Sequence, residues 1–155
     1  MLGPPIDAWY VWFGVSIAAL VVLGVAATAT PSLPDQSEPT AATIDTVAAS
    51  HQPATGHSRL DADRVRVEPY RITLEGDRSE TAILRRGPVT AAERGTALAA
   101  VAHGTPPEAA FEDSAAFRQA AHEARTDERV LEPVGDELVV RSVHWEDASV
   151  TIVTA

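Results

Sequence analysis

Histidine and carboxylate side chains are the groups of this chain that could hold a metal ion. His122-Glu123 begins like the helical zinc-protease motif, in which a second histidine four residues after the first completes a ligand pair on one face. Thr126 occupies that position, so the pair is not made. His51 and His57 lie in a polar stretch, and His103 stands beside a predicted helix end, where a partly positive ring suits the helix dipole. We therefore expect solvated or capping histidines and no metal site.

Other chemical motifs are incomplete. Asp61-Ala62-Asp63 begins like a calcium loop, but Val65 stands at the next ligand position and no glycine follows for the turn. The chain has no glycine-rich phosphate loop and no G-x-S-x-G nucleophile elbow, and the lack of cysteine excludes thiol catalysis. The sequence predicts a protein that is not an enzyme, with no catalytic residues and no cofactor.

Any site must be positioned by the helices and strands that residues 59–155 form. Apolar residues alternate with polar ones at Val65, Val67, Ile72 and Leu74, and extended character resumes over 81–84. Near the C-terminus, 138–145 and 149–153 read as strands joined by a tight hairpin at Glu146-Asp147.

Two helices are predicted between these strands. Thr90-Ala91-Ala92-Glu93 has capping-box spacing and predicts a helix that ends at Gly104. Thr105-Pro106-Pro107-Glu108 predicts the start of a second helix, whose apolar stripe includes Phe117 and whose Arg125 points outward. We expect an α+β domain over 59–155, with two helices on a small antiparallel sheet.

The N-terminal part predicts a transmembrane helix over residues 8–30, after a short head over 1–7. No residue from 8 to 30 is charged, and at 1.5 Å per residue this length spans the roughly 30 Å hydrocarbon core of a bilayer. Trp9, Tyr10 and Trp12 stand in its first turn, where aromatic side chains favour the membrane interface. The lipid bilayer is thus the first expected partner.

Two alternatives to a retained anchor remain open. Ala27-Thr28-Ala29 could serve as a signal-peptidase site, although no basic residue precedes the apolar run and the run is long for a cleaved signal. A buried soluble helix is the third alternative. The small residues of the span could form a face on which a partner helix packs, or could simply contact lipid: Gly14, Ala18, Gly24 and Ala27.

Residues 31–58 are rich in Pro, Ser, Thr and Ala, with three acids and no Arg. This composition predicts a disordered, solvated stalk, in which Ile44 and Val47 could support a short helical turn. A stalk beside a membrane suits a domain raised above the surface. We therefore expect a single-pass protein of the cell membrane, with a cytoplasmic N-terminus and an extracytoplasmic domain.

The charge composition indicates adaptation to concentrated salt. All twelve basic residues are Arg, the chain lacks Lys and Asn, and the net charge is −10. Dispersed acidity keeps a protein hydrated where screening shortens the Debye length to roughly 3 Å at 1 M salt. Such a charge also argues against a nucleic-acid partner.

The positive charge is unevenly distributed. Residues 59–94 hold eight Arg and seven acids, whereas 95–155 hold four Arg and eleven acids. The first stretch could form a docking surface, or its charges could pair on a solvated sheet face; the composition favours pairing.

Four stretches carry a resemblance to a known family: "PIDAWYVWFGVS", "LDADRVRV", "PPEAAFEDSAAFRQAAHEAR" and "LVVRSVHWEDASVTIV". Together they resemble a family, of unassigned function, of small single-span membrane proteins from halophilic archaea. Its members are found near components of type IV pili or Tad-like secretion systems. The family supplies no catalytic residues to transfer.

The resemblance implies a membrane-anchored accessory or structural protein of an archaeal pilus or secretion assembly. The alternative is a stand-alone tethered surface domain that binds a ligand or stabilises the envelope. A processed major pilin is not expected, because Gly3 has no basic neighbour for a prepilin peptidase.

Overall fold

The computed structural model describes residues 35–126, 129–133 and 136–155. Within these residues, no helix is long and apolar enough to cross a membrane. The predicted transmembrane segment 8–30 lies outside the described residues, as does the short head 1–7.

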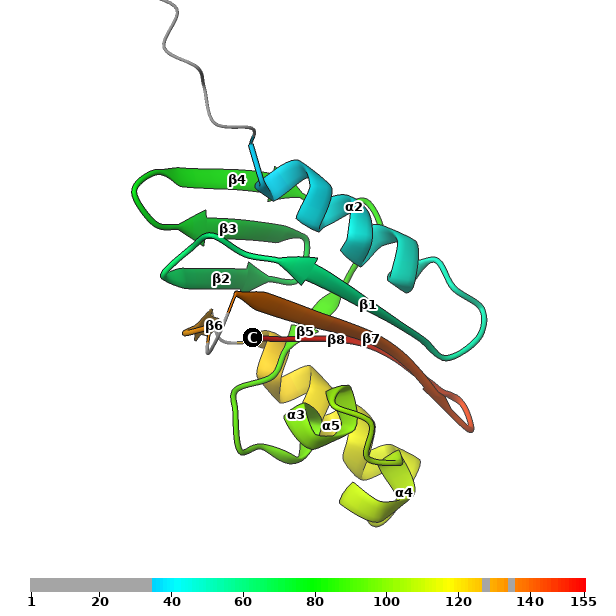
Figure 1. Ribbon diagram of the computed structural model, residues 1–155. Helices are drawn as coiled ribbons and strands as arrows, with labels where there is room; N and C mark the ends of the chain where they lie inside the picture. Colours follow the sequence, from blue (N-terminus) through cyan, green and yellow to red (C-terminus); the bar gives the residue numbers. More distant parts are fainter. Residues whose placement is uncertain (1–34, 127–128, 134–135) are drawn as a thin grey trace, which may run out of the picture. The chain divides into compact units, whose positions relative to one another are not determined.

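The described part is an α+β domain in which helices and strands are mixed along the chain (Figure 1). Its elements, in chain order, are α2 (Ser37–Ala48), β1 (Ala54–Arg59), β2 (Arg64–Glu68), β3 (Arg71–Glu75), β4 (Ser79–Ile83), β5 (Val89–Ala91), α3 (Ala97–Ala102), α4 (Pro107–Ala110), α5 (Ser114–Thr126), β6 (Arg129–Leu131), β7 (Glu137–Trp145) and β8 (Ala148–Thr154).

The strands form two four-stranded sheets. The central sheet has the order β1-β7-β8-β5, and the outer sheet has the order β4-β3-β2-β6. Neighbouring strands are antiparallel except β5 and β8, which run parallel with Val89 opposite Thr151. The prediction of one small antiparallel sheet is therefore wrong in the number of sheets and in this one pair, while the α+β class is confirmed.

The central sheet is covered on both faces. On one face, α2 and the outer sheet pack against it around Ile44, Ile72, Leu138 and Val140. On the other face, α3 and α5 pack around Val101, Phe117, Val143 and Ile152. Figure 1 shows α3, α4 and α5 together on the side of the central sheet opposite α2. Burial on both faces explains why Leu138, Val139 and Val140 follow one another in β7 without an intervening polar residue.

The segment predicted as a disordered stalk is part of the domain from Asp35 onward. Helix α2 buries Ile44 completely, and Gly56 on β1 lies so close beneath it that a Cβ there would be 2.7 Å from Cγ2 of Val47. The amide and hydroxyl of Ser37 donate to Asp35 at the start of α2 and lower the pKa of that carboxyl group. The composition concealed this helix, because its packed face consists of small residues around Ile44 and Val47.

The predicted helix start at Thr90 is also wrong. Thr90 is fully buried in β5, and the helix begins only at Ala97, where the Thr96 hydroxyl accepts a hydrogen bond from the Ala99 amide. Pairing with β8 overrides the local capping pattern. Gly104 does end this helix in a left-handed conformation, with φ of 113°, and the β7–β8 hairpin is confirmed.

A candidate binding site around Tyr70 and Arg125

The residues predicted to meet the membrane lie outside the described residues. These are the interface aromatics Trp9, Tyr10 and Trp12 and the small residues Gly14, Ala18, Gly24 and Ala27. Their predicted roles therefore stay predictions.

The histidines do not come together in the fold. His57 on β1 pairs with Glu137 at 3.0 Å on the exposed surface, and His103 follows the last turn of α3 as its C-terminal cap. His122 is exposed on α5, with the Thr126 hydroxyl bonded to its backbone carbonyl. Across the described ranges, no three His, Asp or Glu side chains are placed to hold a metal ion.

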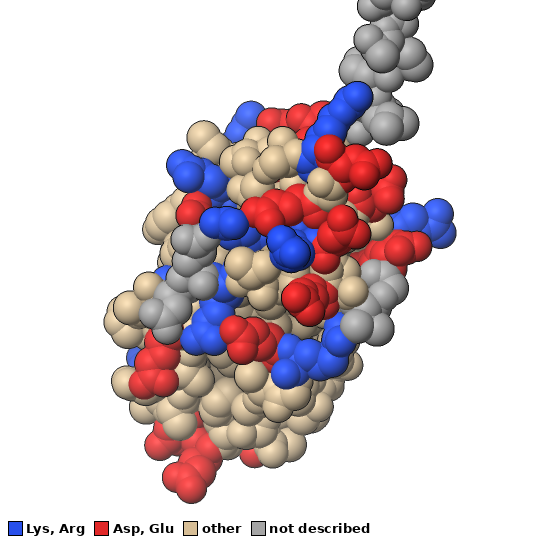
Figure 2. All heavy atoms as spheres, turned by 90° about the vertical axis from the view of Figure 1, so that its left-hand side faces the viewer, with Lys and Arg blue, Asp and Glu red and all other residues tan. Residues whose placement is uncertain are grey.

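The Arg residues of the outer sheet are largely engaged with acids. Arg66 pairs with Glu75 at 2.8 Å, Arg71 pairs with Glu68 at 3.4 Å, and Arg64 lies 4.0 Å from Glu75. Figure 2 shows Arg and acidic side chains interleaved over the face of the domain that lies on the left in Figure 1. This pattern favours charge pairing on a solvated face over a basic docking surface made by the whole 59–94 stretch.

One hollow of about 490 Å³ differs from this paired surface. It lies where the β2–β3 turn, the end of β4 and the end of α5 meet. Its lining includes Tyr70, Ile83 and Arg125, together with the Glu68–Arg71 ion pair. Tyr70 is 56% exposed and Ile83 is 70% exposed, so two large side chains are exposed side by side in one hollow.

The backbone holds Tyr70 in place although its ring is exposed. The amide of Leu84 donates to the Tyr70 carbonyl, and the amide of Val89 donates to the Pro69 carbonyl, both at 2.9 Å. Gly87 lies against the ring, since a Cβ there would be 2.5 Å from the Pro69 carbonyl oxygen and 2.6 Å from Cδ1 of Tyr70. Only a residue without a side chain allows this approach.

Arg125 reaches the hollow from the last turn of α5. Its Nε donates to the buried Thr90 hydroxyl at 2.7 Å, which ties the end of α5 to β5. No other hydrogen bond or ion pair of Arg125 occurs with the described residues, so its terminal nitrogens keep their donor capacity. Burial lowers the pKa of Arg125, and nearby Tyr70 opposes that shift. Arg125 thus presents a partly desolvated cation beside exposed apolar groups.

Two smaller hollows each contain an Arg–Glu ion pair instead. One, of about 200 Å³, lies beside α3 and α5 and contains Arg129 and Glu93, which pair at 2.8 Å. The other, of about 360 Å³, contains Arg64 and Glu75 at the end of the outer sheet. Both resemble the rest of the paired surface more than they resemble the Arg125 hollow.

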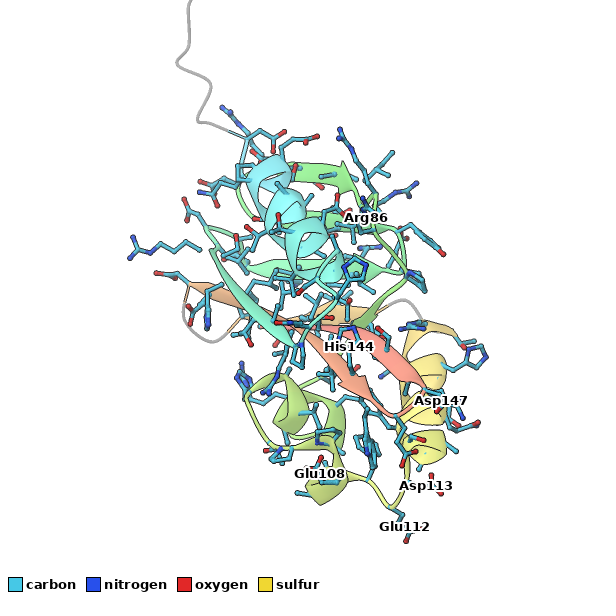
Figure 3. The ribbon with its side chains drawn as sticks, turned by 90° about the vertical axis from the view of Figure 1, so that its right-hand side faces the viewer. Arg86, Glu108, Glu112, Asp113, His144 and Asp147 are labelled. Carbon is cyan, nitrogen blue, oxygen red and sulfur yellow. The ribbon has the colours of Figure 1, made fainter. Side chains whose placement is uncertain are left out.

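Acidic side chains gather at the opposite end of α5. Figure 3 shows Glu108, Glu112, Asp113 and Asp147 at one end of the domain and Arg86 toward the other. Asp113 caps α5 by accepting from the Ala116 amide at 2.7 Å, and Arg118 pairs with Asp147. Asp113 and Asp147 therefore stabilise the first turns of α5. With 13 residues at 1.5 Å each, the start of α5 lies about 20 Å from the end that carries Arg125.

Comparison with known families covers most of the chain. The model of DUF7283, a family of unknown function, matches residues 3–143. The chain belongs to this family. No curated protein and no solved structure matches the chain significantly. The DUF7283 match thus extends from the predicted N-terminal head into β7.

Sequence reasoning missed the three residues that define the hollow in this DUF7283 member. It placed Arg125 outward on a helix, whereas the side chain is partly buried against β5. Tyr70 stands in the β2–β3 turn and Ile83 at the end of β4, where polar residues are usual. An apolar residue at such a position is a weak sign of a binding surface, but it does not indicate that α5 brings Arg125 close to both.

Proposed function

We propose that this protein is a membrane-anchored, non-enzymatic accessory or structural component of an archaeal type IV pilus or secretion assembly. Its domain binds a partner protein through the hollow around Tyr70, Ile83 and Arg125. The observation that carries the proposal is the gathering of two exposed apolar side chains around a cation that pairs with no carboxylate of the described residues.

Aromatic and Arg side chains dominate the binding energy of protein interfaces, especially in a pocket that excludes water. An exposed aliphatic residue beside them adds apolar area, and clustered exposure of this kind is more informative than isolated apolar residues. A close backbone contact already orders the Tyr70 ring, so binding would lose less conformational entropy there.

The predicted helix 8–30 completes the proposal by holding the domain at the membrane, with the N-terminus in the cytoplasm. The sequence motifs support a non-enzymatic role, because the chain lacks cysteine, a glycine-rich phosphate loop and a G-x-S-x-G nucleophile elbow.

Photo-crosslinking in cells tests the docking surface. A photoreactive amino acid placed at Ile83 of the full chain should crosslink to a pilus or secretion component, whereas the same group at Glu112, also exposed, should not. Equal crosslinking from both positions, or none from Ile83, would count against docking at the hollow.

Gene deletion separates the assembly role from the alternative of a stand-alone tethered surface domain. Loss of piliation or secretion supports the assembly role. An intact apparatus with altered envelope or uptake behaviour supports the stand-alone role.

The N-terminal sequence of the membrane-bound protein tests the anchor. A start at Met1 or Leu2 indicates a retained helix, and a start near Thr30 indicates a cleaved signal.

A further inference from the structure

The chemistry of the hollow narrows the kind of partner that it can take, and this step rests on the docking role proposed above. Glu68 and Arg71 offset each other at 3.4 Å. Among the side chains that the structure describes around the hollow, the charge without an ion-pair partner is therefore that of Arg125. A ligand that leaves this guanidinium unpaired would have to bury it further without compensation, which is unfavourable. The complementary group is therefore an anion.

We infer that the hollow binds a carboxylate side chain from an extended segment of a protein partner. The terminal nitrogens of Arg125 donate to that carboxylate, while Tyr70 and Ile83 contact an apolar side chain next to it. The partner segment thus carries an Asp or Glu beside a large apolar residue.

The geometry of the guanidinium supports a planar carboxylate. Nε is occupied by Thr90, which holds the side chain against β5 and leaves the terminal nitrogens to act as donors. A fixed guanidinium offers parallel N–H groups to the two oxygens of a carboxylate, and such charge-assisted bonds are stronger than neutral ones.

The lining of the hollow supports a peptide segment over a free inorganic anion. A bare anion would leave Tyr70 and Ile83 exposed to water, whereas an adjacent apolar side chain would cover them. The volume of about 490 Å³ lies within the range of sites that hold small ligands or a few side chains.

Concentrated salt makes partial burial of the cation important. A Debye length of roughly 3 Å at 1 M leaves little attraction between fully exposed charges, while partly buried pairs are screened much less. Arg125 is partly buried, whereas Arg78, Arg85 and Arg86 are exposed. Under such conditions Arg125 is the better placed of these cations to recognise an acidic partner.

A set of matched peptides tests the carboxylate. The probes are acetylated, amidated peptides with a Leu-Asp-Leu centre and identical peptides with Asn or phosphoserine in place of Asp. Binding to the full chain in detergent and concentrated KCl is measured by fluorescence anisotropy. We expect the Asp peptide to bind at least about tenfold more tightly than the Asn peptide.

Variants of the protein show which residues cause the preference for the Asp peptide over the Asn peptide. In Arg125→Gln the Asp-to-Asn ratio should fall close to one. In the matched control Arg78→Gln the ratio should persist, because Arg78 is exposed and its side chain forms no hydrogen bond or ion pair with the described residues. Ile83→Ala removes an exposed side chain and is expected to weaken both peptides equally. This second variant keeps the test informative if Arg125→Gln unfolds.

Four results would overturn the inference: no binding of the Asp peptide at millimolar concentration, a ratio near one in the unmodified chain, an unchanged ratio in folded Arg125→Gln, or tighter binding of the phosphoserine peptide. Crosslinking from Ile83 is independent of these measurements. If Ile83 crosslinks to a partner but the Asp and Asn peptides bind equally well, the hollow is a docking surface that does not recognise a carboxylate.

Discussion

Asp45 shows how a single side chain can hold the segment that carries the candidate site. From α2, its carboxylate accepts hydrogen bonds from the backbone amides of Arg85 at 3.0 Å and Arg86 at 2.8 Å. These residues lie between Ile83, which lines the hollow, and Gly87, which lies against the Tyr70 ring. A helix that the sequence presents as a stalk is thus connected directly to the loop behind the site.

Asp45→Ala is expected to lower the free energy of unfolding by about 1 kcal/mol, because two amides lose a charged acceptor that water replaces only in part. Urea unfolding of the full chain measures the change. Asp77→Ala is the matched control, since Asp77 is exposed and its side chain forms no hydrogen bond or ion pair with the described residues. Equal effects of both changes would contradict the proposed role of Asp45.

Gly87 matters because of the space that it leaves free. Gly87→Ala would place a methyl group 2.5 Å from the Pro69 carbonyl oxygen, so the 85–88 segment or Tyr70 must move. We expect a loss of about 1 to 3 kcal/mol in stability, together with a shift of the Tyr70 ring signals in NMR spectra. In the control Gly76→Ala, the nearest atoms lie 3.4 Å from the new Cβ, an ordinary contact distance. Unshifted Tyr70 signals in folded Gly87→Ala would show that the glycine does not position the ring.

Among the elements, those fixed by local pattern were predictable from sequence. Strands β2 and β3 alternate apolar and polar residues, and the β7–β8 turn is short enough to define its own hairpin. Strand β5 and helix α2 depend on distant partners instead. The first is a three-residue strand paired with β8, and the second packs a face of mostly small side chains against β1, β4 and β7. For the same reason the site could not be predicted, because α5 brings Arg125 to Tyr70 across 55 positions of sequence.

Helix α2 offers a direct test of whether residues 35–58 fold with the domain. Ile44→Ala should destabilise the protein by about 2 to 5 kcal/mol, since this fully buried side chain contributes to the core between the two sheets. Ile83→Ala makes the same chemical change at a 70% exposed position and should alter stability by less than about 0.5 kcal/mol. Thermal unfolding of both variants provides the comparison. Similar small effects would indicate that 35–58 behaves as a stalk.

For the whole molecule, the main electrostatic problem is a net charge of −10 in a chain of 155 residues. Close ion pairs such as Arg66–Glu75 at 2.8 Å offset part of the repulsion locally. The excess acids repel one another over longer distances, where screening is most effective. Low salt should therefore destabilise the domain as a whole while leaving its short ion pairs largely intact.

We expect the thermal unfolding midpoint to rise with KCl, because the Debye length falls from about 30 Å at 0.01 M to about 3 Å at 1 M and repulsion between acids falls with it. The combined variant Asp77→Asn and Glu112→Gln removes two exposed acids and changes the net charge from −10 to −8. It should unfold at a higher temperature than the unmodified chain in dilute buffer, and the difference should shrink in concentrated KCl. Sucrose serves as an uncharged control, since it strengthens burial without screening. The midpoint could instead rise equally in sucrose and KCl, with no higher midpoint for the variant at low salt. That result would show that the salt acts because solutes are excluded from the protein surface, and not because it screens repulsion between acids.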